Sequence, residues 1–237
     1  MRIPLLLSLA LAASCVSPRY ALETEYGVVR GDDEARVAIV SGELGMATAV
    51  RERLSSTREG PVEVLLLRSE RVDTGAFAGL LSDGRIVLGE DAFVPLRAEF
   101  GVPMRIDLTR YGDPRYYVAH ELAHWLLRES PYEGVPTFVE EGLADTVALE
   151  LLGHLEARHA ELVDAEPRPL PRSAILASRE EYLHDDSSMQ ASLLGTEVVR
   201  RLGFDEIRRL RARDADPFEY VNAAKVKSGP WPWVDAE

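Results

Sequence analysis

Short apolar runs separated by turn residues characterise the first half of the chain after its N-terminus. Such runs predict strands at residues 34–42 (EARVAIVSG), at residues 60–70 (GPVEVLLLRSE), after a turn at Asp83-Gly84, and at residues 102–109 (VPMRIDLT). Residues 43–56 (ELGMATAVRERLSS) instead carry apolar side chains at helical spacing, with arginine and glutamate on the other face. That spacing predicts a helix between the first two strands.

Helical patterns replace the strand patterns in the second half. Asp113 at an N-cap position, followed by Pro114, predicts a helix that ends before Pro131. A second helix is predicted at residues 137–153 (TFVEEGLADTVALELLG), with Thr137 as its cap and Gly153 as its stop. Further on, the pattern predicts a loop at residues 165–173 and two or three helices within residues 187–224. Strands followed by helices predict an α+β domain.

The N-terminus has the layout of a secretory signal peptide. Residues 1–15 (MRIPLLLSLALAASC) contain one basic residue, an apolar stretch and then small residues. A buried N-terminal helix is the alternative interpretation. Cleavage after Cys15 and cleavage after Ser17 both fit, and we assign residues 1–21 to the signal region. The segment also approaches a bacterial lipoprotein signal with Cys15 as the lipidated residue, although Ala12 stands where a large aliphatic residue is usual. Both interpretations as a signal predict an exported protein, periplasmic or extracellular, and the second adds a lipid anchor.

Composition and charge narrow the class of protein and partner. A hydrophobic content of 46% with 28% charged residues allows a real core, and residues 22–237 suit a single domain. The proline-rich loop at residues 168–171 is the one plausible internal boundary, and we expect it not to separate independent domains. Outside the N-terminus no apolar run approaches the ~20 residues of a membrane span. Cys15 is the only cysteine, which excludes disulfides and thiolate chemistry from the mature chain.

The net charge of −13 argues against a nucleic-acid partner, because basic contacts to phosphate drive that binding. The local exception is residues 198–213 (VVRRLGFDEIRRLRAR), whose arginines lie at helical spacing among acids. This pattern predicts a solvated helix face.

Two of the five histidines, His120 and His124, lie one helical turn apart, with Glu121 beside the first. On a helix, positions i and i+4 differ by about 40° of rotation, so both imidazoles face one side and suit a single zinc ion. Glu121 lies about 100° round from His120, where it would reach a water at the metal without being a ligand. This is the geometry of the H-E-x-x-H motif of zinc peptidases, which also occurs by chance in unrelated proteins. The apolar flanks predict a buried helix, and a hydrogen-bonded core pair of histidines is the alternative.

The next predicted helix offers the third ligand that a catalytic zinc site needs. It carries Glu140, Glu141 and, four residues after Glu141, Asp145. Glu141 and Asp145 share one face of that helix, as the two histidines share one face of theirs. We expect Glu141 to be the ligand and Asp145 to accept a hydrogen bond from a ligating histidine, since ligating imidazoles are normally oriented by such a partner. Glu140 is expected at the rim or as a loop anchor.

The combination of HELAH (residues 120–124) with EEGLAD (residues 140–145) after a short loop resembles the gluzincin zinc metallopeptidases, the thermolysin-like group. It most resembles small bacterial proteins described as peptidase MA-like. The resemblance implies His120, His124 and Glu141 as zinc ligands, Glu121 as general base, and Asp145 as the aspartate of the E-x-x-x-D spacing. It implies a thermolysin-like zincin fold, with a small N-terminal mixed sheet and helices before a helical C-terminal half that contains the HExxH helix. The strong motifs cover roughly 35 residues.

The chain also departs from the family pattern. It has no G-x-M-E-N segment, so aminopeptidase activity is not implied. Many MA-like members carry a tyrosine near the start of a later helix, where this chain has Ser188 and Met189. Tyr182 and His184 are the nearest candidates for stabilising the transition state, and a solvated polar loop is an equally good interpretation of both. Other residues are expected to be structural: Tyr116 and Tyr117 in packing, His154 and His159 at the surface, and Asp185 and Asp186 as helix caps.

The sequence therefore predicts a zinc-dependent endopeptidase acting on a peptide or protein, with residues 84–89 (GRIVLG) as the candidate sheet edge for the substrate. Two alternatives stay open. The chain is then either a catalytically silent, zinc-stabilised binding or assembly factor of the cell envelope, or a hydrolase of another amide, such as one in a cell-wall fragment. The pattern gives no oligomeric state.

Overall fold

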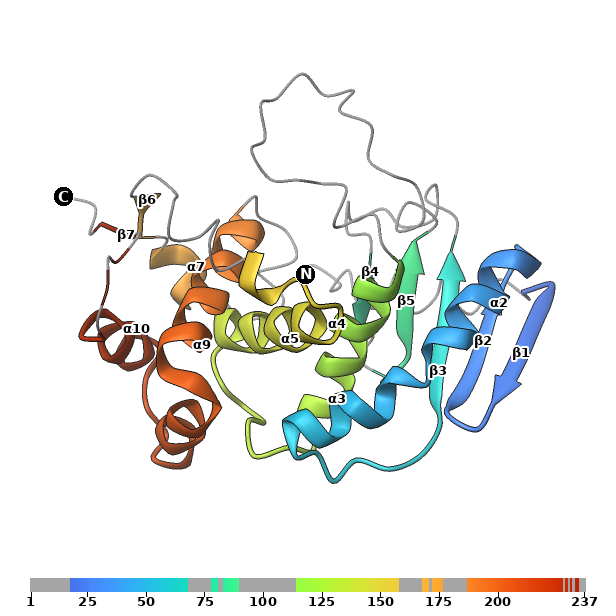
Figure 1. Cartoon of the computed structure of the whole chain (residues 1–237), viewed down its shortest axis with the longest axis horizontal. Coiled ribbons are helices and arrows are strands. Elements are labelled where there is room, and N and C mark those ends of the chain that lie inside the picture. Colours follow the sequence, from blue (N-terminus) through green and yellow to red (C-terminus); the bar gives the residue numbers. More distant parts are fainter. Residues whose placement is uncertain are drawn as a thin grey trace, which may run out of the picture. The chain divides into compact units, whose positions relative to one another are not determined.

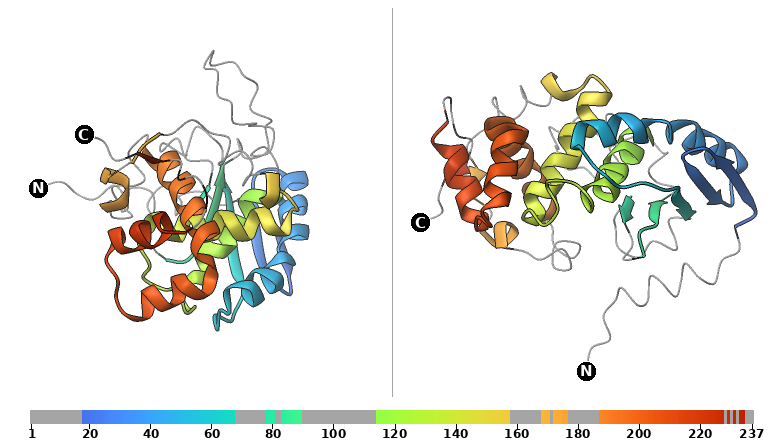
Figure 2. Two further views of the ribbon diagram at one scale, coloured as in Figure 1. Left: turned by 60° about the vertical axis from the view of Figure 1, so that its left-hand side comes forward. Right: turned by 90° about the horizontal axis from the view of Figure 1, so that it is seen from below.

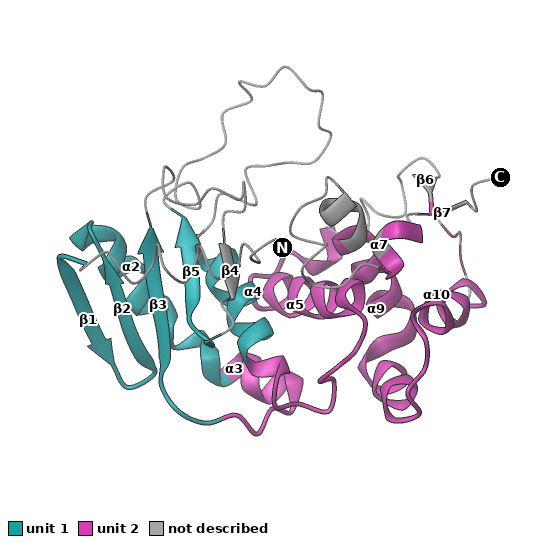
Figure 3. Ribbon diagram, turned by 180° about the vertical axis from the view of Figure 1, so that it is seen from behind, with its two compact units in different colours: residues 1–48, 59–125 teal, residues 49–58, 126–237 magenta. Residues whose placement is uncertain are grey.

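The structure is a computed structural model that describes residues 18–67, 78–80, 83–89, 114–157, 168–170, 172–176, 187–227, 229, 231 and 233–234. It is a mixed α+β protein, as the sequence predicts (Figure 1). The chain groups into two compact units, coloured in Figure 3. Unit 1 comprises residues 1–48 and 59–125, and unit 2 comprises residues 49–58 and 126–237. The single-domain organisation and the signal region stay predictions.

Unit 1 contains a five-stranded mixed sheet. In spatial order its strands are β1 (Tyr20–Thr24), β2 (Gly27–Gly31), β3 (Val62–Leu67), β5 (Ile86–Gly89) and β4 (Ala78–Leu80). β2 pairs in parallel with β3, and β3 with β5, whereas both outer strands pair antiparallel. The central strands bury Val64, Ile86 and Leu88, which places the core of the sheet at β3 and β5. The strands predicted at 60–70 and after Asp83-Gly84 are thus confirmed, and the one predicted at 102–109 lies outside the described residues.

Residues 34–42 form a helix, so the strand predicted there is wrong. Helix α2 (Glu34–Glu43) begins after Asp33, whose side chain accepts a hydrogen bond from the backbone N–H of Arg36. Val37, Val40 and Leu44 are buried, and their spacing of three, four and seven residues is helical. The alternation of small and apolar residues fits a strand equally well, and the cap decides between the two. Figure 2 shows α2 beside β1 and β2, which it contacts.

The predicted helix at 43–56 is confirmed as α3 (Met46–Leu54). The segment after α3 donates hydrogen bonds to the C-terminal end of the next helix in the chain. The hydroxyl of Ser56 donates to the carbonyl oxygens of Leu126 (2.6 Å) and Glu129 (3.2 Å), and the N–H of Thr57 also donates to Glu129 (2.9 Å). These carbonyls end α4 (Pro114–Leu127) and the turn that follows it. Since helix ends leave carbonyl groups without intrahelical partners, these bonds fix the C-terminal end of α4.

Helix α5 (Thr137–Leu151) confirms the second predicted helix, but its N-cap is Pro136, without a side-chain cap, and Thr137 is the first helical residue. Proline suits the helix start because its missing N–H would have no partner there. Gly153 ends the helix as predicted: its φ is +72°, and the N–H groups of Gly153 and His154 donate to Glu150 and Leu149. These two bonds form a Schellman motif.

Five further described elements of unit 2 follow α5. They are β6 (Arg168–Pro169), α7 (Arg172–Leu176), α9 (Ser187–Ala212), α10 (Pro217–Lys225) and β7 (Trp233–Val234). Two of them, α7 and α9, pack against α5. α9 is two helices joined across a kink at Gly203, so the prediction of two or three helices there is confirmed. Asp216 and Glu219 form a capping box at the start of α10. The loop predicted at 165–173 differs in that it contains β6, which pairs in parallel with β7.

Two glycines bring α5 and α9 into direct backbone contact. A Cβ atom at Gly195 would lie 1.8 Å from the carbonyl oxygen of Phe138, and one at Gly142 would lie 2.1 Å from the carbonyl carbon of Gly195. Both obstacles are main-chain atoms, which side-chain rotation cannot move aside. The crossing therefore requires glycine at both positions.

Replacing Gly195 by alanine is expected to lower the free energy of unfolding by about 1–3 kcal/mol, because the added methyl group forces the two helices apart. Denaturant unfolding measures the change. Gly42→Ala in α2 is the matched control: no atom lies within 4 Å of a Cβ there, and alanine favours the helix by about 1 kcal/mol. If Gly195→Ala is as stable as Gly42→Ala, the close backbone contact between α5 and α9 is contradicted.

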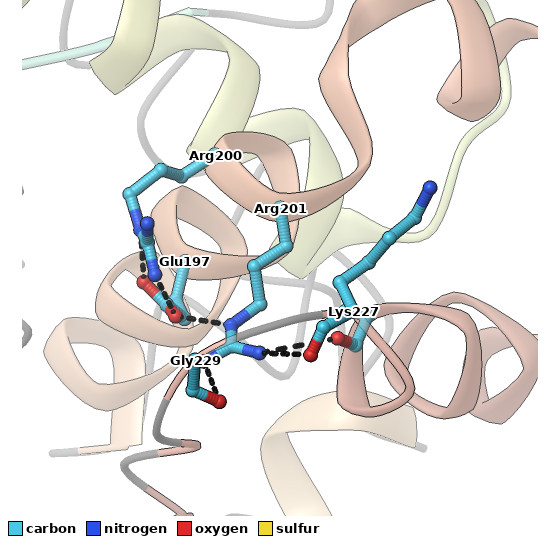
Figure 4. Close-up of polar contacts among 6 residues, drawn as sticks. Glu197, Arg200, Arg201, Lys227 and Gly229 are labelled. Carbon is cyan, nitrogen blue, oxygen red and sulfur yellow. Dashed lines mark hydrogen bonds and ion pairs between the residues drawn. The ribbon is translucent and has the colours of Figure 1, made fainter.

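Buried charges link α9 to the segment that follows α10 (Figure 4). Glu197 and Arg201 have side chains that are 1% exposed, and Arg201 Nε lies 2.5 Å from a carboxylate oxygen of Glu197. Arg200 binds both oxygens of the same carboxylate, which raises the pKa of Arg200. Arg201 also donates to the carbonyl groups of Lys227 and Gly229 (3.2 and 3.4 Å). The solvated face predicted for residues 198–213 is therefore wrong at Arg201, which lies in the core.

The later arginines of the same segment behave as predicted. Arg208 and Arg209 pair with Asp205 and Glu206 on the exposed side of α9.

Among the described residues, no helix combines the length and the apolar character that crossing a membrane requires. α9, the longest of these at 26 residues, is rich in arginine.

Candidate metal centre

Helix α4 carries the HELAH motif on a largely buried stretch. Glu121 and His124 are 5% and 3% exposed, and His120 is half-buried. The residues between and after them, including Leu122, Ala123 and Trp125, are buried as the apolar flanks predict. Because imidazole and carboxylate groups are costly to bury, their presence here calls for a specific partner or ligand.

The two imidazoles of α4 face one another. Their Nε2 atoms lie 3.0 Å apart, and their ring centroids are 4.7 Å apart with an interplanar angle of 73°. Zn–N bonds of about 2.0–2.1 Å in a tetrahedral site place two ligand nitrogens about 3.3 Å apart. The observed separation also fits one Nε2–H donating to the other ring, the core pair that the sequence left open. Either way, helix geometry alone aims both nitrogens at the same point.

A third possible ligand comes from α5. One ligand atom from each of His120, His124 and Glu141 lies within 4.8 Å of the other two. These are the three residues that the sequence suggested as ligands. Two imidazoles and one carboxylate form a donor set of catalytic zinc sites, so the residues fit the metal that the motif implies.

The neighbouring acids of α5 differ in their surroundings. Glu140 and Glu141 are half-buried, whereas Asp145 is only 2% exposed. The Oδ2 atom of Asp145 accepts hydrogen bonds from the hydroxyl groups of Ser192 and Thr196 (3.2 Å for Thr196). No local pattern predicts these two partners, which lie 47 and 51 positions further along the chain. The bond from a histidine to Asp145 stays a prediction.

Tyr116 and Tyr117 are buried, as expected for packing residues. The ring of Tyr116 lies 5.6 Å from that of His120, at 37°, and its edge-on contact with Tyr117 spans 5.3 Å. His120 thus has an aromatic neighbour one turn before it on the same helix. The contact restricts the orientation of the imidazole that faces His124.

Several other residues singled out from the sequence lie outside the described part of the chain: His159, Tyr182, His184, Asp185 and Asp186. The proposed role of Tyr182 or His184 in stabilising a transition state therefore stays a prediction. His154 is half-buried just beyond the end of α5.

The candidate substrate edge at residues 84–89 is wrong. β5 (Ile86–Gly89) is hydrogen-bonded to β3 on one side and to β4 on the other, so it lies inside the sheet. The three-residue strand β4 covers the backbone groups that a substrate would need. The ends of this sheet, as described, are β1 and β4.

The comparisons with known proteins identify no relative: no family model, curated protein or solved structure matches the chain. The structure itself defines a mixed α+β protein with a His-His-Glu group that could hold a metal ion. The resemblance to gluzincins consequently rests on the motif residues and their spacing.

Proposed function

We propose that the chain is a zinc-dependent metallopeptidase of the thermolysin-like, peptidase MA-like type. The observation that supports this most strongly is the grouping of His120, His124 and Glu141 within 4.8 Å. The HExxH spacing on α4 adds a buried acid, Glu121, next to the first of these residues. A core histidine pair would need neither the third donor nor that acid.

Each side chain has a distinct role in this proposal. His120, His124 and Glu141 hold the ion, and zinc, when bound, supplies Lewis acidity to water and to a peptide carbonyl group. Glu121 takes a proton from the attacking water and delivers it to the leaving amine, which conserves protons across the hydrolysis.

Zinc binding is the first test. The wild-type chain, freed of metal and reloaded, is expected to bind about one equivalent of zinc, because a catalytic site holds one ion with three protein ligands. His124→Ala is expected to lose this equivalent, since it removes one ligand. His154→Ala is the matched control, a half-buried histidine outside the group. Atomic absorption after gel filtration measures the metal, and a wild-type chain that binds none contradicts the proposal.

Digestion of a peptide library separates the peptidase from its alternatives. The zinc-loaded chain is expected to cleave peptides, and a chelator is expected to abolish the cleavage. A chain that binds zinc tightly but cleaves neither peptides nor cell-wall amides is instead the catalytically silent binding factor. Cleavage of the cell-wall amides alone identifies the other hydrolase.

A further inference from the structure

Helix α9 contributes two hydroxyl groups to the surroundings of the candidate metal centre. We propose that Ser192 and Thr196 are positioning residues, which hold the Asp145 carboxylate in the orientation that a ligating histidine needs. This inference rests on the proposed zinc site, and it names two side chains that neither the HExxH motif nor the ExxxD spacing includes.

The contacts at Asp145 are directional. Both hydroxyl groups address the same carboxylate oxygen, Oδ2, with Ser192 making the shorter contact. A histidine N–H would then have the other oxygen, Oδ1, as its acceptor. The hydroxyl oxygen of Thr196 also lies 2.9 Å from the carbonyl oxygen of Ser192, to which it can donate. The charged carboxylate is the stronger acceptor of the two. Two donors on one oxygen fix the rotation of the carboxylate about the Cβ–Cγ bond of Asp145.

Burial makes these bonds consequential. Asp145 is 2% exposed and Thr196 is fully buried, so water cannot easily replace a lost donor. Loss of the donor lowers the free energy of unfolding more when the acceptor is buried than when it is exposed, and more again when the acceptor is charged. Removing the hydroxyl groups should therefore let the carboxylate rotate or recruit another donor.

The glycine crossing explains why α9 can reach Asp145. Gly142 lies one turn before Asp145 in α5, and Gly195 lies between Ser192 and Thr196 in α9. Cβ atoms at these glycines would overlap the opposite backbone, so only glycine permits this helix separation. Short side chains such as serine and threonine can then span the gap between the helices.

A purely structural role is the competing explanation, in which the hydroxyl groups merely satisfy a buried acid. Such a role predicts lower stability without a change at the metal. The positioning role predicts a change in metal affinity, because outer partners of a ligating histidine typically contribute 10–100-fold to affinity. Zinc affinity therefore separates the two explanations.

The experiment compares the isosteric double variant Ser192→Ala/Thr196→Val with Ser192→Thr/Thr196→Ser, which keeps both hydroxyl groups. Competition with a chromophoric chelator gives the zinc dissociation constant, and thermal unfolding of the zinc-free proteins gives their stability. We expect the first variant to bind zinc about tenfold more weakly and the second to stay near the wild-type value. With Co²⁺ in place of zinc, the visible absorption bands should shift in the first variant alone.

Wild-type zinc affinity and Co²⁺ spectrum in Ser192→Ala/Thr196→Val would overturn the inference, even if its stability falls. Asp145→Asn separates failure of the positioning role from failure of the proposed zinc site. If Asp145→Asn weakens zinc binding and the double variant does not, the zinc site stands and the positioning role fails. A wild-type chain that binds no zinc overturns the proposed function itself. If the double variant does not fold, Thr196→Val against Thr196→Ser carries the same comparison.

Discussion

Replacing Glu121 by glutamine is expected to lower kcat for peptide hydrolysis by about 10²–10⁴-fold, the usual contribution of a general acid–base group. Glutamine has nearly the same shape as glutamate but cannot accept a proton at neutral pH. Because Glu121 is beside the ligand group and not part of it, the zinc content is expected to stay at the wild-type level. Single-turnover peptide cleavage and metal analysis on the same sample measure both quantities.

Glu129→Gln is the matched control for this prediction. Glu129 follows the end of α4, and its side chain is 54% exposed and pairs with Arg58 at 3.8 Å. The same chemical change there should leave kcat and zinc content unchanged. Wild-type turnover in zinc-loaded Glu121→Gln would remove the general-base assignment, whereas loss of zinc in that variant would mean that Glu121 helps to hold the metal.

Removing the carboxylate of Glu197 is expected to lower the free energy of unfolding by about 3–5 kcal/mol. Glu197→Ala leaves the guanidinium group of Arg201 in the core, with neutral carbonyl groups as acceptors at Ala224, Lys227 and Gly229. Carbonyl groups solvate a buried cation less well than a carboxylate at 2.5 Å. The segment after α10 is also expected to loosen, because the Arg201 guanidinium group that binds it loses the carboxylate that orients it. Denaturant unfolding and limited proteolysis at the C-terminus check the two effects.

Two comparisons sharpen this second prediction. Glu206→Ala breaks an exposed pair with Arg209 on the same helix, and exposed pairs contribute about 0.5 kcal/mol or less. Replacing the buried pair together, Glu197→Leu with Arg201→Met, is expected to recover much of the loss, because no charge then stays buried without its partner. A small loss in Glu197→Ala, similar to that of Glu206→Ala, would contradict the burial of this network.

Local signals allowed the helices of the second half to be predicted, but were ambiguous in the first. Pro114 and Gly153 mark helix ends through their own backbone preferences, so they act without help from distant residues. Residues 34–42 fit both the helical and the strand period, and the N-cap at Asp33 is the signal that distinguishes the helix. The edge prediction at 84–89 failed because strand order depends on which strands pair, and no local pattern specifies that β4 returns to cover β5.

Arg201 shows the same limit for a side chain. Its spacing among acids predicted a solvated face, as Arg208 and Arg209 confirm. Its burial depends on the segment around Lys227, which lies over α9. Lys227 is 26 residues after Arg201 in the sequence. Charge patterning along one helix contains no information about what packs on it.

The sequence by itself determined the direction of His120 and His124, because a helical turn places both imidazoles on one side whatever surrounds them. It also determined that Glu141 and Asp145 share a face of α5. Only the tertiary structure decided which atoms meet those side chains: the approach of Glu141 to the histidines, and the hydroxyl groups of Ser192 and Thr196 on Asp145. The reason is physical, since rotation along a helix is a local property, whereas the contact between helices depends on side chains and glycines far apart in the chain.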